Sequence, residues 1–183
     1  MLMRWEALFA DLEAEFGAEA AREQNSEIQE FVRIERARQS LMQRLARHVG
    51  TRIDVQLLGA ERIGGRLAGI GKDWLMLQHG GSEELIPVQA VAWWAALEAG
   101  RAPEPGERRV RFSQALRVLV RDRARVSVGG IDGQLLASGT LDQVGQDFLE
   151  VALHARDEFR RPGALLGRTV IPFAALARVR REG

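Results

Sequence analysis

One stretch of the sequence is written twice, and this repetition limits the folds that the chain can adopt. Residues 65–77 (GRLAGIGKDWLML) and 139–151 (GTLDQVGQDFLEV) share glycine, aspartate, aromatic and aliphatic positions at one constant offset. The matched pairs are Gly65 and Gly139, Leu67 and Leu141, Ile70 and Val144, Gly71 and Gly145, Asp73 and Asp147, Trp74 and Phe148, Leu75 and Leu149, and Leu77 and Val151. Self-similarity at a fixed spacing indicates a repeated structural unit. The sequence therefore predicts two copies of one small motif.

The pattern around each copy predicts a mainly β chain. Ile53, Val55 and Leu57 alternate with polar residues, which is typical of a half-buried strand. The next strand of each copy contains glycines, where a missing side chain allows a sharp bend. Strands are expected at 52–57, 62–70, 74–77, 85–88 and 90–94, and again at 125–128, 135–144, 148–153, 170–173 and 175–179. A helix is expected before each set, at 112–121 in the second copy.

A proline corner is repeated as well, at a larger offset. Ile86-Pro87 is followed by Ala90-Val91, and Ile171-Pro172 is followed by Ala175-Leu176. Because proline lacks an N–H donor, it belongs at a corner and not inside a central strand. The two corners lie 85 residues apart, whereas the first repeat has an offset of 74 residues. We therefore expect an insertion in the second copy, in the arginine-rich loop at 154–167.

The N-terminal region is expected to form two helices. Apolar residues at Trp5, Leu8, Phe9, Leu12 and Phe16 form the stripe of an amphipathic helix, which Gly17 is expected to end or kink. Ser26 and Gln29 have the spacing of a capping box, which predicts the start of a second helix. Charges are mainly acidic at 6–30 and mainly basic at 33–47. This polarity favours antiparallel pairing of the two helices or pairing with another copy; the alternative is a solvated hairpin that covers the adjacent β structure.

The order of elements resembles a known family. A helix followed by five short bent strands, with the signature G-x-L-x-x-(I/V)-G-x-D-(W/F)-L, is similar to the Sm/LSm/Hfq-like fold of small SH3-like barrels over residues 38–97 and 110–181. The resemblance implies two tandem five-stranded barrels, each preceded by a helix. It also implies RNA binding through two loops of each barrel and, in many members, ring assembly through strands four and five. The Asn and the Arg-Gly of the RNA-binding motifs are absent here, and the corner prolines are similar to those of PRC-barrel adaptors, which bind proteins.

The resemblance divides the chain into four segments. Residues 1–37 are expected to be a helical extension, 38–97 the first barrel with its leading helix, and 110–183 the second barrel with its leading helix. Residues 98–109 hold two prolines and two glycines among charges and are expected to be a linker. The fused barrels would satisfy one another's strand edges, which favours a monomer or dimer, whereas unsatisfied outer edges would favour larger rings.

The implied RNA-binding loops can be placed in the sequence. The loop between strands two and three lies at 71–73 and 145–147, and the loop between strands four and five at 87–89 and 172–174. Formal net charge is only +1, so a nucleic-acid site has to be a local patch. The candidate phosphate contacts are Arg121, Arg123, Arg125, Arg156, Arg160, Arg161, Arg168 and Lys72. The alternative is that the arginines form separate ion pairs with Asp122, Asp157 and Glu158.

Aromatic residues mark candidate interfaces. Trp93 and Trp94 are adjacent in an expected strand, so one should fill the core while the other is exposed or buried at an interface. Trp5 and Phe9 of the N-terminal helix are the other candidate interface residues.

The sequence does not indicate catalysis. The three histidines lack metal-ligand spacing, cysteine is absent, and the serines lack the glycine context of a nucleophile elbow. We expect no enzymatic activity, metal, cofactor or small-molecule substrate. Charges interrupt the N-terminal apolar positions, and no apolar run approaches the roughly 18 residues of a membrane span, so a cytoplasmic protein is expected.

These observations lead to two expectations for function. The first is a non-enzymatic, RNA-binding regulatory factor of the Sm-like class, in a bacterium whose GC-rich genome explains the alanine- and arginine-rich composition. The second is a protein–protein adaptor that acts through its N-terminal helices and strand edges.

Overall fold

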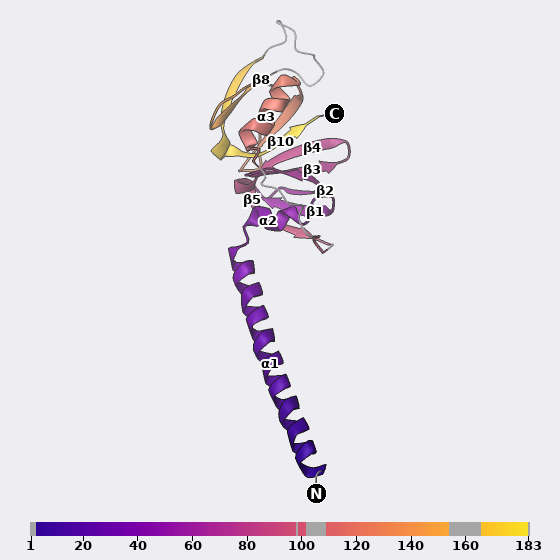
Figure 1. Cartoon of the computed structure of the whole chain (residues 1–183). Helices are drawn as coiled ribbons and strands as arrows, with labels where there is room; N and C mark the ends of the chain where they lie inside the picture. The colour runs from indigo at the N-terminus through magenta and orange to yellow at the C-terminus, as the bar shows by residue number, and fades with distance from the viewer. Residues whose placement is uncertain (1–2, 98, 102–108, 154–165, 183) are drawn as a thin grey trace. The chain divides into compact units, whose positions relative to one another are not determined.

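The computed structural model describes residues 3–97, 99–101, 109–153 and 166–182, without the side chains of residues 3–14 and 20. The chain divides into two compact units, Met1–Ser40 and Leu41–Gly183. The first unit is helical and the second is built mainly of strands (Figure 1). None of the described helices combines the length and hydropathy that a bilayer crossing requires.

The first unit contains one continuous helix, α1 (Met3–Arg38). The predicted break at Gly17 and the predicted helix start at Ser26 do not occur. Glycine inside a helix costs only about 1 kcal/mol relative to alanine, and serine costs less, so neither residue interrupts a 36-residue helix. Because α1 is a single helix, the predicted hairpin of two N-terminal helices is wrong.

The second unit contains two similar halves. The first half comprises α2 (Leu41–Ala46), β1 (Arg52–Leu57), β2 (Arg62–Ile70), β3 (Trp74–His79), β4 (Ser82–Pro87), the 3-10 turn η1 (Val88–Ala90) and β5 (Val91–Ala96). The second half comprises α3 (Phe112–Arg121), β6 (Arg125–Gly130), β7 (Leu135–Val144), β8 (Phe148–Leu153), β9 (Gly167–Pro172), η2 (Phe173–Ala175) and β10 (Leu176–Arg181). The bounds predicted for α3, β2, β7 and β8 agree with the structure.

The ten strands of the described residues form one antiparallel sheet, in the order β5-β1-β2-β3-β4-β10-β6-β7-β8-β9. The prediction of two closed five-stranded barrels is therefore wrong, whereas the prediction of a mainly β chain is confirmed. Neither half closes on itself, because β4 of the first half pairs with β10 of the second half. Opposite charges meet at this join: Glu84 accepts a hydrogen bond from Arg180, and Arg181 lies 3.5 Å from Glu83.

The two halves share their pairing registers. Leu75 lies opposite Ile86 in the first half, and Leu149 lies opposite Ile171 in the second. The second strand of each half has a register shift at the matching position, which bends the strand and increases its twist. The two copies of the repeated sequence thus form strands with the same pairing register and the same bend.

In each copy of the signature, the aromatic ring packs on the turn that contains the glycine. A Cβ atom at Gly71 would overlap the indole ring of Trp74, and a Cβ atom at Gly145 would overlap the ring of Phe148. Each ring lies over the bare backbone of the turn three residues earlier. Glycine at this position therefore makes room for the aromatic residue that begins the third strand.

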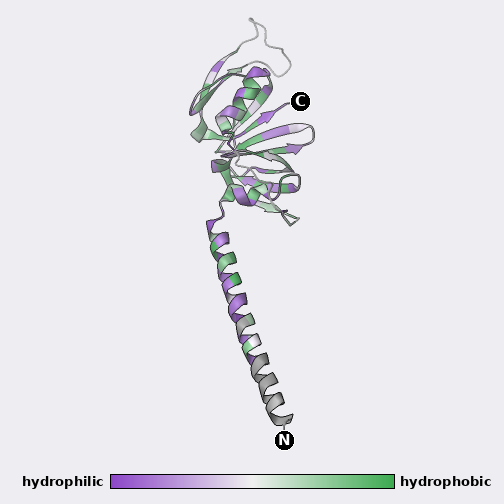
Figure 2. Ribbon diagram, viewed as in Figure 1, coloured by the Kyte–Doolittle hydropathy of each residue, from purple (hydrophilic) through white to green (hydrophobic). Residues whose placement is uncertain are grey.

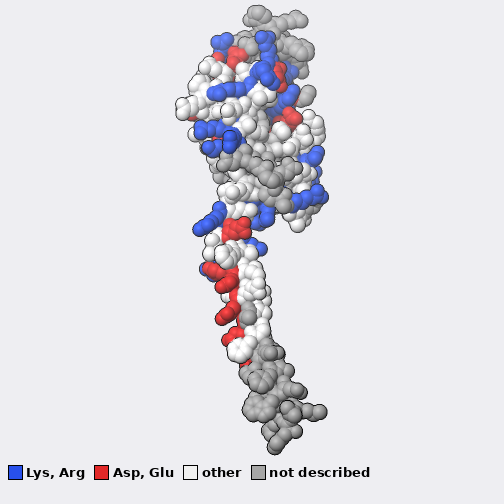
Figure 3. Space-filling view, in the orientation of Figure 1, with Lys and Arg blue, Asp and Glu red and all other residues white. Residues whose placement is uncertain are grey.

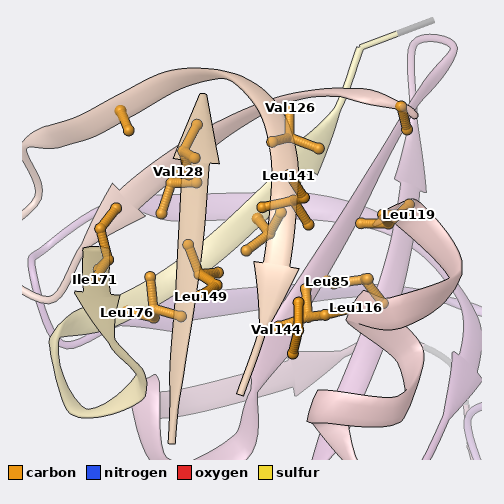
Figure 4. Close-up of a cluster of buried hydrophobic side chains, with 14 of the residues drawn as sticks. Leu85, Leu116, Leu119, Val126, Val128, Leu141, Val144, Leu149, Ile171 and Leu176 are labelled. Carbon is orange, nitrogen blue, oxygen red and sulfur yellow. The ribbon is translucent and has the colours of Figure 1, made fainter. Parts of the chain in front are cut away.

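Each half has its own hydrophobic cluster, and residues are exchanged between the two clusters at the join. Hydrophobic residues are prominent in the strands and in α3 (Figure 2). Leu85 of β4 packs in the cluster of the second half, and Ala177 of β10 packs in the cluster of the first half. Figure 4 shows Leu85 beside Leu116 of α3 and Val144 of β7. The join is therefore continuous with both cores.

Candidate nucleic-acid interface

Four turns of the second unit meet where the two halves of the sheet join. In the first half the N–H of Val88 donates to the carbonyl of Asp73 at 2.9 Å, and in the second half the N–H of Phe173 donates to the carbonyl of Asp147 at 2.7 Å. Across the halves, Nε2 of Gln89 donates to the carbonyl of Phe173 at 3.1 Å. The turns for which RNA contacts were predicted thus lie together.

The segment that leads into α3 is hydrogen-bonded to one of these turns and to the strand that follows it. The carbonyl of Val110 accepts hydrogen bonds from the N–H of Lys72 at 2.8 Å and from Nε1 of Trp74 at 3.0 Å. The N–H of Phe112 donates to Oδ1 of Asp73 at 2.7 Å. A carboxylate in this position is favoured because the N-terminus of a helix carries partial positive charge. The first half therefore holds the start of a helix that packs on the second half.

These elements enclose a surface groove of about 670 Å³, which we term the junction groove. Both halves and α3 contribute to its lining, which consists of Asp73, Pro87, Val88, Gln89, Arg109, Arg111, Phe112, Ser113, Gln114, Arg117, Gln146 and Phe173. Its volume lies in the range of about 300–1,000 Å³ that is usual for ligand sites.

The junction groove has an excess of positive charge. Arg109, Arg111 and Arg117 are exposed on its lining. Asp73 is the one carboxylate among the described lining residues, and its Oδ1 is already hydrogen-bonded to the N–H of Phe112. The planar guanidinium group of arginine matches the geometry of phosphate oxygens. The groove is therefore suited to an anionic ligand.

Three glutamines add hydrogen-bonding capacity to the groove. A carboxamide has two N–H donors and a carbonyl oxygen with two lone pairs, so it can bond to the edge of a nucleobase. Oε1 of Gln114 accepts from the N–H of Arg111 at 2.8 Å, and Gln89 donates across the join. Gln146 reaches the groove from the β7–β8 turn. Gln89 and Gln114 each have more hydrogen-bonding capacity than these single bonds use.

Three of the predicted phosphate contacts lie around a different pocket. Arg121, Arg123 and Arg168 line a hollow of about 580 Å³, which we term the arginine pocket, together with Asp142 and Glu150. Arg168 Nε lies 3.4 Å from a carboxylate oxygen of Asp142 and 3.6 Å from one of Glu150. The structure thus brings these arginines together but partly neutralises them with acidic neighbours.

Two further predicted contacts, Arg125 and Lys72, line neither the junction groove nor the arginine pocket. Arg125 begins β6 and is half-buried, whereas Lys72 is exposed in the β2–β3 turn. Arg156, Arg160 and Arg161 lie outside the described residues.

The two basic sites are linked along α3. Arg117 lines the junction groove, and Arg121, one helical turn further, lines the arginine pocket. Residues four apart lie on the same face of a helix. Figure 3 shows basic side chains distributed over the face on which α3 lies. The arginines of α3 therefore connect the junction groove with the arginine pocket.

The candidate interface tryptophans have different environments. Trp94 packs against the first core and edge-on to His48, with ring centroids 5.0 Å apart. Trp93 is 44% exposed, and the guanidinium carbon of Arg62 lies 5.4 Å from the centre of its ring. Trp5 and Phe9 belong to α1, and their side chains lie outside the described part of the chain.

Sequence reasoning missed the arginines of the junction groove. In the sequence, Arg109 falls in the predicted linker, and no prediction is made for Arg111 or Arg117. The alternation of Arg109, Val110 and Arg111 just before a predicted helix was the available signal. Among the described residues, no group of three or more histidine and acidic side chains is arranged to hold a metal ion.

Comparison with protein-family models, curated proteins and solved structures gave no match. Interpretation of the junction groove therefore depends on its own residues.

Proposed function

We propose that this chain is a non-enzymatic RNA-binding protein whose junction groove receives the bases of a single strand. The observation that carries the proposal is the lining of the groove, in which Arg109, Arg111 and Arg117 lie beside the carboxamides of glutamines from three different elements. The resemblance to Sm-like proteins supports it, because the turns that meet at the groove correspond to the RNA-binding loops of that family.

Recognition would combine two kinds of contact. Arginines at the start of α3 would bind phosphates, which position the strand without reading its sequence. The carboxamides would bond to base edges, which are accessible in unpaired RNA, and the ring of Phe173 would offer an apolar surface beside them. Arg121 and the arginine pocket would extend the phosphate path along α3.

Fluorescence anisotropy with a labelled single-stranded RNA of mixed sequence tests the proposal. We expect affinity to fall steeply between about 50 and about 200 mM salt, because each neutralised phosphate of a single strand contributes about 0.7 to the log–log slope. The double variant Arg111→Gln/Arg117→Gln should lower the slope by about 1.4 if each arginine binds one phosphate.

A matched control uses Arg36→Gln/Arg38→Gln. It removes the same charge from exposed positions of α1. We expect this variant to bind RNA like the wild type. An absence of binding at low salt, or an equal loss in both double variants, would exclude the junction groove as the site.

A second candidate function, a protein adaptor, is favoured by the exposed apolar residues of α1. Phe16 is 69% exposed, Phe31 is 73% exposed and Ile28 is 52% exposed. Figure 3 shows acidic side chains along one side of the described part of this helix. An adaptor would retain its partner when the groove arginines are changed and lose it in the variant Phe16→Ser/Phe31→Ser. The opposite pattern in a pull-down would exclude this function.

A further inference from the structure

A second hollow lies at the other end of the central join. The hairpin that connects β3 and β4 (Figure 1) lines it with residues 78–83, together with Arg66 of β2 and Arg181 of β10. We term this hollow of about 610 Å³ the hairpin pocket. β4 runs from Ser82, at the hairpin pocket, to Pro87, at the junction groove, so the two sites lie at opposite ends of one strand. No residue that the structure describes lines both sites.

Four of the side chains that line the hairpin pocket form one row across four strands. Arg66 of β2 lies opposite Gln78 of β3. Gln78 lies opposite Glu83 of β4, which in turn lies opposite Arg181 of β10. Directly opposite residues of antiparallel strands project from the same face of the sheet, with Cβ atoms about 4.5–5.5 Å apart. The row therefore has an arginine at each end and a carboxamide and a carboxylate between them.

Contacts in and beside the row hold these side chains in place. Nε2 of Gln78 donates to Oε1 of Glu83 at 3.3 Å, and Nη1 of Arg181 lies 3.5 Å from Oε2 of Glu83. Nε of Arg66 donates to the carbonyl of Gly50 at 3.2 Å. A guanidinium group has five N–H donors, more than these contacts use, and both arginines are exposed. Each arginine can therefore bind a further anionic group.

The fold itself does not require an arginine at both ends of the row. The second half repeats the row on its own strands, where Thr140 lies opposite Ala152, and Ala152 lies opposite Arg168. In the first half, Arg66 also lies opposite Arg52 of β1, and like charges in this arrangement destabilise a sheet. A bound anion relieves that repulsion. The row is thus better suited to binding than to stability.

Two glycines keep the turn of the hairpin free of side chains. Gly80 and Gly81 have φ angles of +54° and +86°, in the left-handed region that favours glycine. A Cβ atom added at either position would meet no atom beyond its chain neighbours within 4 Å. His79 and Ser82 lie opposite one another beside the turn, and Nε2 of His79 lies 3.4 Å from the buried carboxylate of Glu84. A ligand can therefore reach the backbone of the turn next to an imidazole and a hydroxyl group.

We propose that the hairpin pocket binds a small molecule with an anionic group at each end and hydroxyl or amino groups between them. Each arginine binds one carboxylate or phosphate group, for which its planar fork of N–H donors is suited. Glu83 repels a negative charge at the centre of the row and accepts hydrogen bonds from O–H or N–H groups there. Because Arg66 belongs to the first half and Arg181 to the second, the ligand connects the two halves.

Sequence patterns did not predict this site, because its side chains come from four strands that are neighbours only in the folded sheet. Ligand binding at the hairpin pocket does not depend on RNA binding at the junction groove, because the two sites have separate linings.

An NMR titration of the full chain with two matched pairs of probes tests the proposal. Fructose 1,6-bisphosphate is compared with fructose 6-phosphate, and glucarate with gluconate, so the members of each pair differ by one anionic group. We expect saturable shifts of the amide signals of Gly80, Gly81 and Ser82. The probe with two anionic groups should bind about tenfold more tightly than its partner, because it forms one more charge-assisted pair. A response to the bisphosphate alone would identify a phosphate ligand, and a response to glucarate alone would identify a carboxylate ligand.

Single variants test the two arginines. Arg66→Gln and Arg181→Gln should each remove most of the difference within a probe pair, because one end of the ligand then lacks its arginine. Both residues are exposed, and unchanged amide signals outside the pocket verify that each variant is folded. The control is Arg62→Gln, which removes an exposed arginine from the same strand and face without changing the lining of the pocket. It should bind the probes like the wild type.

Three results would overturn the proposal. The first is an absence of saturable shifts at the hairpin with all four probes. The second is a tenfold difference within a pair that persists in folded Arg66→Gln and Arg181→Gln. The third is an equal loss in Arg62→Gln, which would show a general effect of surface charge.

Discussion

The two halves of the sheet have the same backbone plan and different edges. Their strands pair in the same registers and bend at matching positions, yet only the central edges carry opposite charges. Glu84, fully buried, lies between Arg178 and Arg180, and Arg178 also bonds to Glu61 at 2.8 Å. The two halves therefore share a backbone plan, while charge distinguishes the two edges that pair within the chain.

The matching turns have also taken different roles. Asp73 and Asp147 both accept a backbone N–H through their carbonyl oxygen, but the carboxylate of Asp73 additionally caps α3. The cap brings the arginines that begin α3 to the first half. Duplication thus supplied two similar turns, and one of them was adapted to build the junction groove.

The largest expected effect comes from breaking the central charge pairing. Glu84→Ala removes the buried partner of Arg180 and Arg178, which should cost about 3 kcal/mol of unfolding free energy. This is the lower end of the range for a broken buried ion pair, because Arg178 keeps Glu61. The corresponding variant of the second half, Thr169→Ala, should change stability by no more than about 0.5 kcal/mol. Urea denaturation measures both. If Glu84→Ala lost as little unfolding free energy as Thr169→Ala is expected to lose, the central join would not depend on Glu84.

An intermediate effect is expected where the halves are alike. Gly71→Ala and Gly145→Ala each force an aromatic ring off the turn, which should cost about 1–3 kcal/mol. Gly69→Ala is the control, because its added Cβ would meet only the methyl group of Met76, at 3.9 Å. Thermal unfolding compares the three variants. A neutral result at either turn would show that the glycine is not required by the ring.

The smallest effect is a pH dependence confined to the first half. Burial, with the nearby guanidinium groups of Arg44 and Arg47, holds the pKa of His48 below its ordinary value of 6.5. As the pH falls, His48 therefore takes up its proton at a higher pH in the unfolded chain than in the folded chain. The contribution of His48 to stability should be constant above that value and should fall as the pH drops below it. The second half has Arg121 at the matching distance before its first strand.

Urea denaturation between about pH 7.5 and about pH 5.5 measures this dependence. The variant His48→Gln should lose less stability over that interval than the wild type. If the unfolding free energy of the variant fell with pH as steeply as that of the wild type, groups other than His48 would cause the pH dependence.

Local patterns predicted the elements of the sheet, because alternation and glycine bends depend on neighbouring residues. The helix at Phe112–Arg121 and the strand at Arg62–Ile70 follow from such patterns. The way the halves join depends on contacts such as that between Glu84 and Arg180, which lie 96 residues apart. Consecutive glutamates on one strand and alternating arginines on another were the signal for it. Their pairing is visible only once the strands are placed side by side.

Only part of the candidate site was predicted, because its turns depend on local patterns whereas the position of its arginines depends on a long-range contact. The four turns followed from the repeat, and the structure brings them together. The arginines at the start of α3 were missed because Val110, 36 residues from Trp74 in sequence, is held to the first half by a bond that no local pattern predicts.

Hydrogen exchange with and without single-stranded RNA tests whether RNA binds in the junction groove, because it locates the binding site on the chain. We expect slower exchange in the turns at 71–73, 87–89 and 145–147 and at the start of α3, with little change in α1. Protection confined to α1, or protection that avoids all of these turns, would contradict the assignment of RNA binding to the junction groove.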